Sequence, residues 1–84
     1  MQTSEIGDRL AKIISTVFHV SKAELPPEPN QQNVASWDSL GHLRLILAVE
    51  AAFAVRFPTD RIPTLTSYKA LLQELDHALR EPSR

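Results

Sequence analysis

The stretch that decides the fold is residues 37–57, which read WDSLGHLRLILAVEAAFAVRF. Apolar residues recur in it at helical spacing, which predicts a helix over residues 38–54. Asp38 or Ser36 can cap its beginning, because a short oxygen-bearing side chain can accept a bond from an early backbone N–H group. We expect residues 56–58, Arg-Phe-Pro, to end the helix.

This helix carries two apolar stripes instead of one. A surface helix needs only one stripe to face the core. Either the helix is central and buried on most sides, or the second stripe, bordered by Arg44 and Glu50, stays partly exposed and binds partner proteins. Periodicity alone does not separate the two interpretations. The first stripe contains Ile46, Val49 and Phe53, and the second contains Leu40, Leu43, Leu47 and Ala51.

Two more main helices flank this one in the sequence. A first helix is predicted over residues 4–18, capped by Thr3 or Ser4, and a last helix begins after Thr66 or Ser67. In the first, Asp8, Arg9 and Lys12 fall on the polar side and Ile6, Leu10, Ile13, Ile14 and Val17 on the apolar side. The inward face of the last helix contains Tyr68, Leu71, Leu72, Leu75 and Leu79.

The connecting segments are rich in proline and polar residues. Residues 19–37 contain three prolines and four consecutive amides, so we expect a long loop there, anchored on the core by Leu25, Val34 and Trp37. A short helical turn is predicted from Thr59 to Pro63, and residues 81–84 look like a frayed tail. The 84 residues therefore predict a single all-α domain, 1–84, built as a four-helix bundle with three main helices and one short helix.

Composition excludes several classes of function. The chain has no cysteine, so it has neither disulfides nor thiolate chemistry of its own, and its three histidines show no metal-ligand spacing. The net charge is −1 with no basic stripe, which argues against nucleic-acid binding; a recognition helix would offer only Arg44 and Arg56. We expect no membrane span and, without a signal-peptide pattern, a cytoplasmic protein.

Ser39 stands at the predicted start of the central helix, directly after the long loop. Backbone N–H groups at a helix N-terminus lack intrahelical partners, and the helix dipole there favours an anion, so a phosphate on this hydroxyl would lie in a suitable field. Serine is also a common capping residue that carries no modification. These residues alone therefore leave the role of Ser39 open.

The sequence from Trp37 to Phe57 resembles the second helix of acyl carrier proteins, in which an Asp-Ser-Leu motif holds the serine that receives 4′-phosphopantetheine. The motif here is Asp38-Ser39-Leu40. The resemblance extends over residues 4–80, through the first helix, the long loop, the short third helix and the last helix. It implies a carrier, not an enzyme, that is modified at Ser39 by a phosphopantetheinyl transferase using coenzyme A.

The resemblance also implies roles for neighbouring residues. Asp38 is expected as a cap and as a contact for the modifying enzyme, and Leu40, Leu43, Arg44, Leu47 and Glu50 as the face that meets acyl-loading and acyl-processing enzymes. We interpret His42 as an exposed surface residue, because no orienting acid can be assigned to it as a base. Trp37 is expected to be a packing anchor whose indole N–H needs a partner.

The charge of the central helix departs from the family. Many fatty-acid carriers are strongly acidic along this helix, whereas here Asp38 and Glu50 are balanced by Arg44 and Arg56. Steering towards a basic partner should therefore be weak, which favours a specialised pathway or dedicated partners. We expect a monomeric acyl carrier of a fatty-acid, polyketide or related lipid pathway. An aminoacyl or peptidyl carrier with the same arm, and an unmodified helical adaptor, are the alternatives.

Overall fold

The computed structural model describes residues 3–80. Its elements in chain order are α1 (Thr3–Phe18), η1 (Lys22–Glu24), α2 (Ser39–Phe53), η2 (Ile62–Thr64) and α3 (Tyr68–Arg80). No strand occurs within residues 3–80, so the predicted all-α class is confirmed. The predicted frayed tail, residues 81–84, lies outside the described part of the chain.

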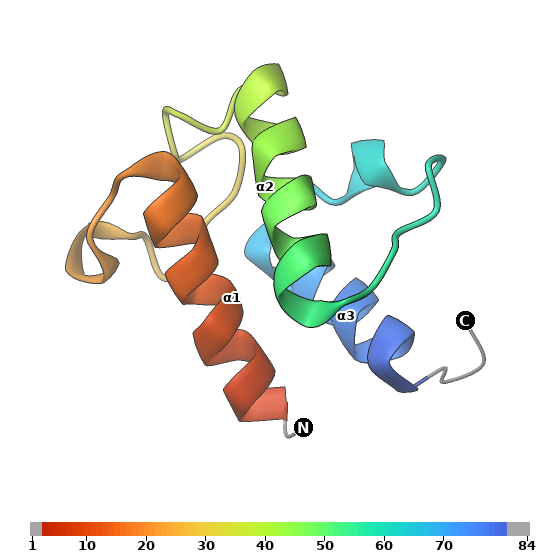
Figure 1. Cartoon of the computed structure of the whole chain (residues 1–84). Helices are drawn as coiled ribbons and strands as arrows, with labels where there is room; N and C mark the ends of the chain where they lie inside the picture. Colours follow the sequence, from red (N-terminus) through yellow and green to blue (C-terminus); the bar gives the residue numbers. More distant parts are fainter. Residues whose placement is uncertain (1–2, 81–84) are drawn as a thin grey trace.

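The three long helices form a bundle around one core. Helix α1 packs against both α2 and α3, and Figure 1 shows α1 and α2 side by side with α3 passing behind the lower half of α2. The fully buried side chains come from all three helices and include Leu10, Ile14, Leu45, Leu71 and Leu75. This core fixes α2 along one side only, which leaves its opposite side for other contacts.

Helix α1 faces the core with residues spaced four apart. Ile6, Leu10, Ile14 and Phe18 are buried, whereas Ile13 and Val17, which the sequence analysis placed on the inward face, are only half-buried. Helix α1 begins at Thr3, so both predicted caps, Thr3 and Ser4, lie within its first turn.

Arg9 lies on the exposed, polar side of α1, as predicted, but its side chain also contacts α2. Its guanidinium lies 4.5 Å from the centre of the Phe53 ring and donates to the Ala52 carbonyl oxygen at 2.9 Å. A guanidinium over an aromatic face is attracted by the ring quadrupole. Arg9 therefore joins α1 to the end of α2.

Helix α2 ends at Phe53, within one residue of the predicted end at residue 54. Ala54 takes up a left-handed backbone conformation with φ of 55°, and its N–H donates to the carbonyl oxygen of Glu50. The Glu50 carboxylate accepts a bond from the Phe57 N–H at 2.8 Å. A left-handed residue satisfies the last carbonyls of a helix and turns the chain, so the stop comes before Pro58.

Helix α3 is capped by Ser67, one of the two predicted residues. Its Oγ accepts a bond from the Ala70 N–H at 3.0 Å. Tyr68, in the first turn, packs close to Gly7 of α1, and burial together with the nearby carboxylate of Asp8 raises the pKa of its phenol. Leu71 and Leu75 are buried, while Tyr68, Leu72 and Leu79 are half-buried against the core.

The long loop before α2 is fastened to the rest of the molecule at two places. Tyr68 N–H donates to the Pro29 carbonyl at 2.8 Å, and Gln31 N–H donates to the Thr66 carbonyl at 3.0 Å. Further along, Val34 and Trp37 are buried, as predicted, and Leu25 is half-buried. These anchors bring the loop to the beginning of α2 in one defined conformation.

The short helices differ from the prediction. The helical turn expected from Thr59 to Pro63 is instead η2, at Ile62–Thr64, and the single turn η1, at Lys22–Glu24, was not predicted. Pro63 is accommodated in η2 because the first N–H groups of a helix have no intrahelical partner to lose.

Candidate functional site

Ser39 is the first residue of α2 and is exposed. Asp38 precedes it as the helix cap, with an extended backbone, and its carboxylate accepts a bond from the Gly41 N–H at 2.8 Å. The Asp38 carbonyl accepts the first bond of the helix, from the His42 N–H at 2.7 Å. Of the two predicted caps, Asp38 is therefore the correct one. The hydroxyl-bearing residue next to it stands at the tip of the helix and faces solvent.

Gly41 allows this tip to pack tightly against the segments before it. A Cβ atom at this position would overlap the backbone carbonyl oxygen of Ser36 and lie 2.9 Å from the ring of Phe18. Backbone atoms cannot move aside as the end of a flexible side chain can. Only glycine therefore fits in the first turn of α2 with the loop and α1 in their present places. Sequence reasoning missed this residue.

His42 is buried, which contradicts its interpretation as an exposed surface residue. Its Nδ1 accepts a bond from the Trp37 indole Nε1–H at 3.0 Å, and its Nε2 lies 2.8 Å from the Ile62 carbonyl oxygen. An indole N–H only donates, so Nδ1 accepts and Nε2–H donates to Ile62. The prediction failed because sequence spacing does not reveal a buried partner for a polar ring.

Trp37 has the anchoring role that was predicted. It is 1% exposed, and its ring lies 5.3 Å from that of Phe18, centre to centre. Its N–H finds its required partner in His42. The chain of contacts from Trp37 through His42 to Ile62 thus joins the loop before the site, α2 and η2.

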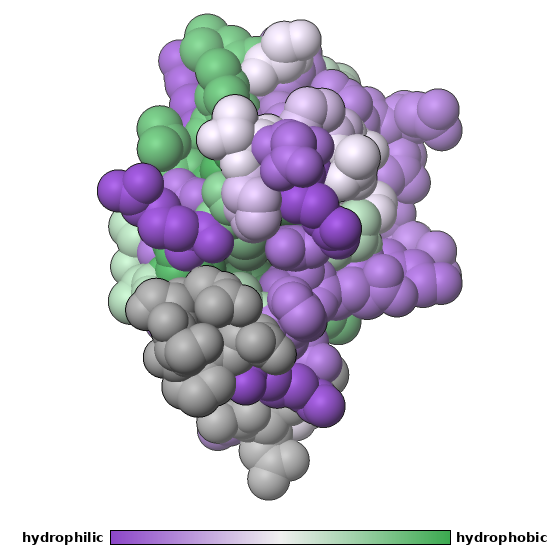
Figure 2. All heavy atoms as spheres, turned by 90° about the vertical axis from the view of Figure 1, so that its right-hand side faces the viewer, coloured by the Kyte–Doolittle hydropathy of each residue, from purple (hydrophilic) through white to green (hydrophobic). Residues whose placement is uncertain are grey.

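The second apolar stripe of α2 lies on the surface. Leu40, Leu43 and Leu47 are 59%, 54% and 65% exposed, whereas the residues of the first stripe are buried. Figure 2 shows the corresponding hydrophobic surface as green atoms along the upper left edge, beside a mostly hydrophilic face over η2 and α3. The exposed interpretation of this helix is therefore correct. We call this set, Leu40, Leu43, Leu47 and Ala51, the apolar stripe.

The two charged residues predicted to border the stripe differ in their surroundings. Arg44 is exposed, one helical turn after Leu40 and one before Leu47. Glu50 is half-buried, and its carboxylate is engaged by the Phe57 N–H. Glu50 therefore holds the end of α2, a role that sequence spacing did not indicate.

A small notch lies beside Ser39, between the end of α1 and the first turns of α2. Its volume is about 250 Å³. Its lining residues are Val17, Phe18, His19, Ser36, Asp38, Leu40, Gly41 and Arg44.

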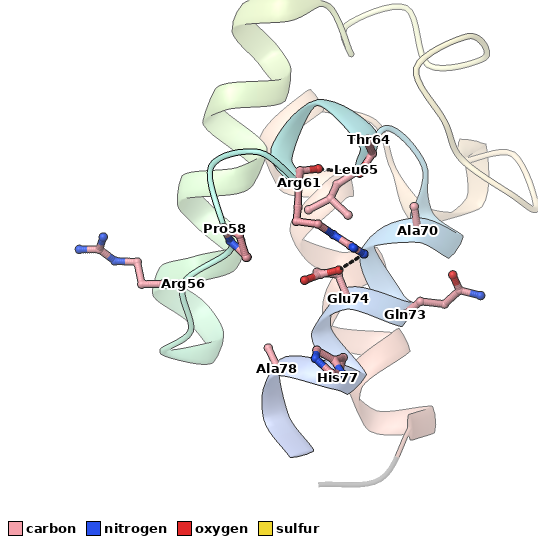
Figure 3. Close-up of a pocket in the computed structure, with 10 residues that line it drawn as sticks. All are labelled: Arg56, Pro58, Arg61, Thr64, Leu65, Ala70, Gln73, Glu74, His77 and Ala78. Atoms are coloured by element: carbon pink, nitrogen blue, oxygen red, sulfur yellow. Dashed lines mark hydrogen bonds and ion pairs between the residues drawn. The ribbon is translucent and has the colours of Figure 1, made fainter. Parts of the chain in front are cut away.

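A larger groove of about 600 Å³ lies along α3, under the loop that connects α2 to η2. Figure 3 shows the ion pair that crosses it, in which Arg61 and the buried Glu74 approach to 2.7 Å. Arg56 also belongs to the lining, but its side chain points away from the groove, past the end of α2. None of the site residues predicted from the sequence lines this groove. We call it the α3 groove.

Residues 3–80 offer neither a metal site nor a membrane-spanning helix. No cluster of histidine, cysteine or acidic side chains in this part of the chain has the geometry to hold a metal ion. Nor is any described helix both long and apolar enough to cross a bilayer. The candidate functional features of this part of the chain are the exposed Ser39, the apolar stripe and the two cavities.

Comparison with known proteins bears on these features. No protein-family model matches the chain. It is, however, 33% identical to the acyl carrier protein of Guillardia theta over 60 residues, which cover 71% of this chain and 74% of that protein. The chain belongs to the acyl carrier protein family. Members of that family are carriers that do not themselves catalyse a reaction, and in this one the Asp-Ser-Leu sequence stands at the very beginning of α2.

Proposed function

We propose that this chain is an acyl carrier protein that holds acyl groups as thioesters on a 4′-phosphopantetheine arm attached to Ser39. It would pass them between partner enzymes of a fatty-acid, polyketide or specialised lipid pathway. The observation that carries the proposal is the position of Ser39, exposed at the first residue of α2. Membership of the acyl carrier protein family supports it.

The residues around Ser39 suit a phosphate ester. The first backbone N–H groups of a helix and its dipole stabilise an anion at this position. The Asp38 carboxylate accepts a hydrogen bond from the Gly41 N–H and so stabilises the first turn of the helix, while Ser39 stays exposed. The exposed side of the tip leaves room for an arm that extends into solvent.

The imidazole that follows Ser39 in α2, His42, is not available as a base for the modification. Both ring nitrogens of His42, the nearest imidazole in sequence, are engaged by Trp37 and Ile62, so His42 does not activate Ser39. A phosphopantetheinyl transferase would take up the serine proton. A bond forms between Ser39 Oγ and the phosphorus that carries pantetheine, the pyrophosphate bond of coenzyme A breaks, and adenosine 3′,5′-bisphosphate leaves. The thiol of the attached arm then carries the acyl group.

The proposed docking surface for the transferase and the acyl-processing enzymes is the helix face beside Ser39. It contains Leu40, Leu43 and Leu47, which are exposed, and Arg44 at their border. Large apolar side chains that gather on a surface mark interaction sites. Glu50, predicted as a fifth member, is proposed only as a support for this face, because its carboxylate binds the backbone of Phe57.

The proposal is tested by intact mass spectrometry after incubation with coenzyme A and a promiscuous phosphopantetheinyl transferase. We expect the wild-type chain to gain the mass of one phosphopantetheine and the Ser39→Ala variant to gain none. Ser36→Ala is the matched control, since Ser36 is also exposed but lies before the helix, and it should be modified like the wild type. An unchanged wild-type mass would disprove attachment of the arm.

Two alternatives are separated by further outcomes. The exposure of the apolar stripe is also what an unmodified helical adaptor requires, and that function is favoured if no arm is attached. If the arm is attached, offering the modified protein to acyl-loading and aminoacyl-loading enzymes distinguishes an acyl carrier from an aminoacyl or peptidyl carrier, because only the cargo differs.

A further inference from the structure

The acidic and basic residues of the α2 segment are used in opposite ways. The carboxylate of Asp38 accepts a hydrogen bond from the Gly41 N–H at the beginning of the helix, and that of Glu50 accepts one from the Phe57 N–H beyond its end. Arg44 and Arg56 are exposed, and within residues 3–80 neither guanidinium has a hydrogen bond or ion pair. The formal charges cancel, but each carboxylate has one of its bonds within the chain, whereas both guanidinium groups, in the described part of the chain, keep all of their donors for a partner.

Of these two arginines, Arg44 lies on α2 beside the apolar stripe and Arg56 lies beyond the end of the helix. Arg44 is four residues after Leu40 and three before Leu47, so it lies on the same side of α2, and it is among the residues that line the notch. Arg56 comes three residues after the end of α2 and points away from the α3 groove. The stripe thus has a cationic side chain near its beginning and another beyond its end.

We propose that the protein partner of this face presents an apolar patch bordered by carboxylates, which meet Arg44 and Arg56. This proposal deepens the proposed function and rests on it for the nature of the partner, an enzyme that acts on the carrier. A guanidinium binds a carboxylate through two parallel N–H donors, so such pairs fix orientation as well as add affinity. A partner with a basic border would leave both arginines facing like charges.

The other charged groups nearby do not reverse this argument. Arg61 forms an ion pair with the buried Glu74 in the α3 groove, so neither of these two charges is left for a partner protein. Asp60 is exposed, but it lies in the loop before η2, outside the helix that carries the stripe. On α2 itself, between Ser39 and Phe53, the charged side chain that is both exposed and unpaired is Arg44.

The test uses two synthetic helical peptides as probes. Both have the same stripe of leucines, flanked in one by glutamates and in the other by lysines, and each is titrated into the full, isotope-labelled chain while amide chemical shifts are recorded. We expect the glutamate peptide to bind about tenfold more tightly at low salt, with shifts at the apolar stripe, and this preference to shrink at high salt. Arg44→Glu with Arg56→Glu should reverse it.

A matched control separates local contacts from net charge. Lys12→Glu with Lys69→Glu changes the net charge equally on exposed positions of α1 and α3 and should leave the preference for the glutamate peptide in place. The proposal is overturned if the lysine peptide binds as tightly as the glutamate peptide, if neither peptide binds, or if the control variant loses the preference. It is also overturned if sedimentation shows a dimer of the wild-type chain that Leu47→Ala dissociates, because a second copy then covers the apolar stripe. If the chain accepts the arm but shows no preference for the glutamate peptide, only the proposal of an acidic partner is disproved. If it prefers the glutamate peptide but never accepts the arm, only the carrier function is disproved.

Discussion

At the scale of single residues, Gly41 allows the close packing of the first turn of α2, and this packing sets the position of Ser39. The first turn of α2 fits against the Ser36 carbonyl and the Phe18 ring only because Gly41 has no side chain there. Intrinsic helix propensity alone would favour alanine over glycine in a helix by about 1 kcal/mol. Helix propensity alone predicts that Gly41→Ala raises the free energy of unfolding, whereas the close packing at this position predicts that it lowers it.

Gly41→Ala should lower the free energy of unfolding by ~1–3 kcal/mol, because the new Cβ forces the backbone at Ser36 or the helix tip to shift. Urea unfolding of the unmodified protein measures this change. Gly7→Ala is the matched control: its Cβ would meet the Oη of Tyr68 at 2.6 Å, the far end of a side chain that can move, so the loss should be smaller. A stabilised Gly41→Ala variant would contradict the tight fit.

Single residues are also where sequence reasoning had least to work with. Asp38, as a cap beside Ser39, was predictable because a short acidic side chain before an apolar run has a known role. His42 and Gly41 were not, because their roles depend on Trp37, Ile62 and Ser36, and the spacing of residues does not show which of them meet.

At the scale of elements, α2 has a face for the fold and a face for partners. Ile46, Val49 and Phe53 are buried, while Leu40 and Leu47 are mostly exposed on the opposite side. An exposed leucine contributes little to stability, because it has little surface to remove from water on folding. The two faces should therefore respond differently to the same kind of truncation.

Phe53→Ala should reduce the free energy of unfolding by ~3–5 kcal/mol, since it removes a buried ring and the surface on which Arg9 stacks. Leu47→Ala should change it by less than about 0.5 kcal/mol. Leu47→Ala should instead weaken binding of the glutamate-flanked peptide, measured in the same titration as for the wild type. Equal losses of stability in the two variants would show that the apolar stripe packs within the fold.

The elements themselves were predictable to different degrees. The three long helices follow from apolar periodicity, and two of their caps, Asp38 and Ser67, from side chains that can bond to the next turn. The end of α2 was predicted to within one residue, but the left-handed conformation of Ala54 was not, because an alanine side chain gives no indication of it. The turn η2 was placed too early because its position is set by contacts with His42 and Glu74, far apart in the sequence.

At the scale of the whole molecule, a chain of 84 residues has a stability of roughly 4–13 kcal/mol, so a few contacts between segments decide whether the site keeps its shape. The contacts from Trp37 through His42 to Ile62 add polar bonds between three segments that also pack on the core. The bonds from Tyr68 and Gln31 hold the long loop on its other side. The order of the arm-bearing tip thus depends on loops as well as on helices.

His42→Phe should keep an aromatic ring at this position but leave the Trp37 N–H and the Ile62 carbonyl without partners, at a cost of ~2–4 kcal/mol. Urea unfolding measures the loss, and the emission of Trp37, the chain's one tryptophan, should shift to longer wavelength if its indole reaches water. His77→Phe, on the exposed side of α3, should leave both quantities nearly unchanged. If His42→Phe behaves like this control, the loop, α2 and η2 are held together by apolar packing, and the three-segment connection through the imidazole has no part in keeping Ser39 in place.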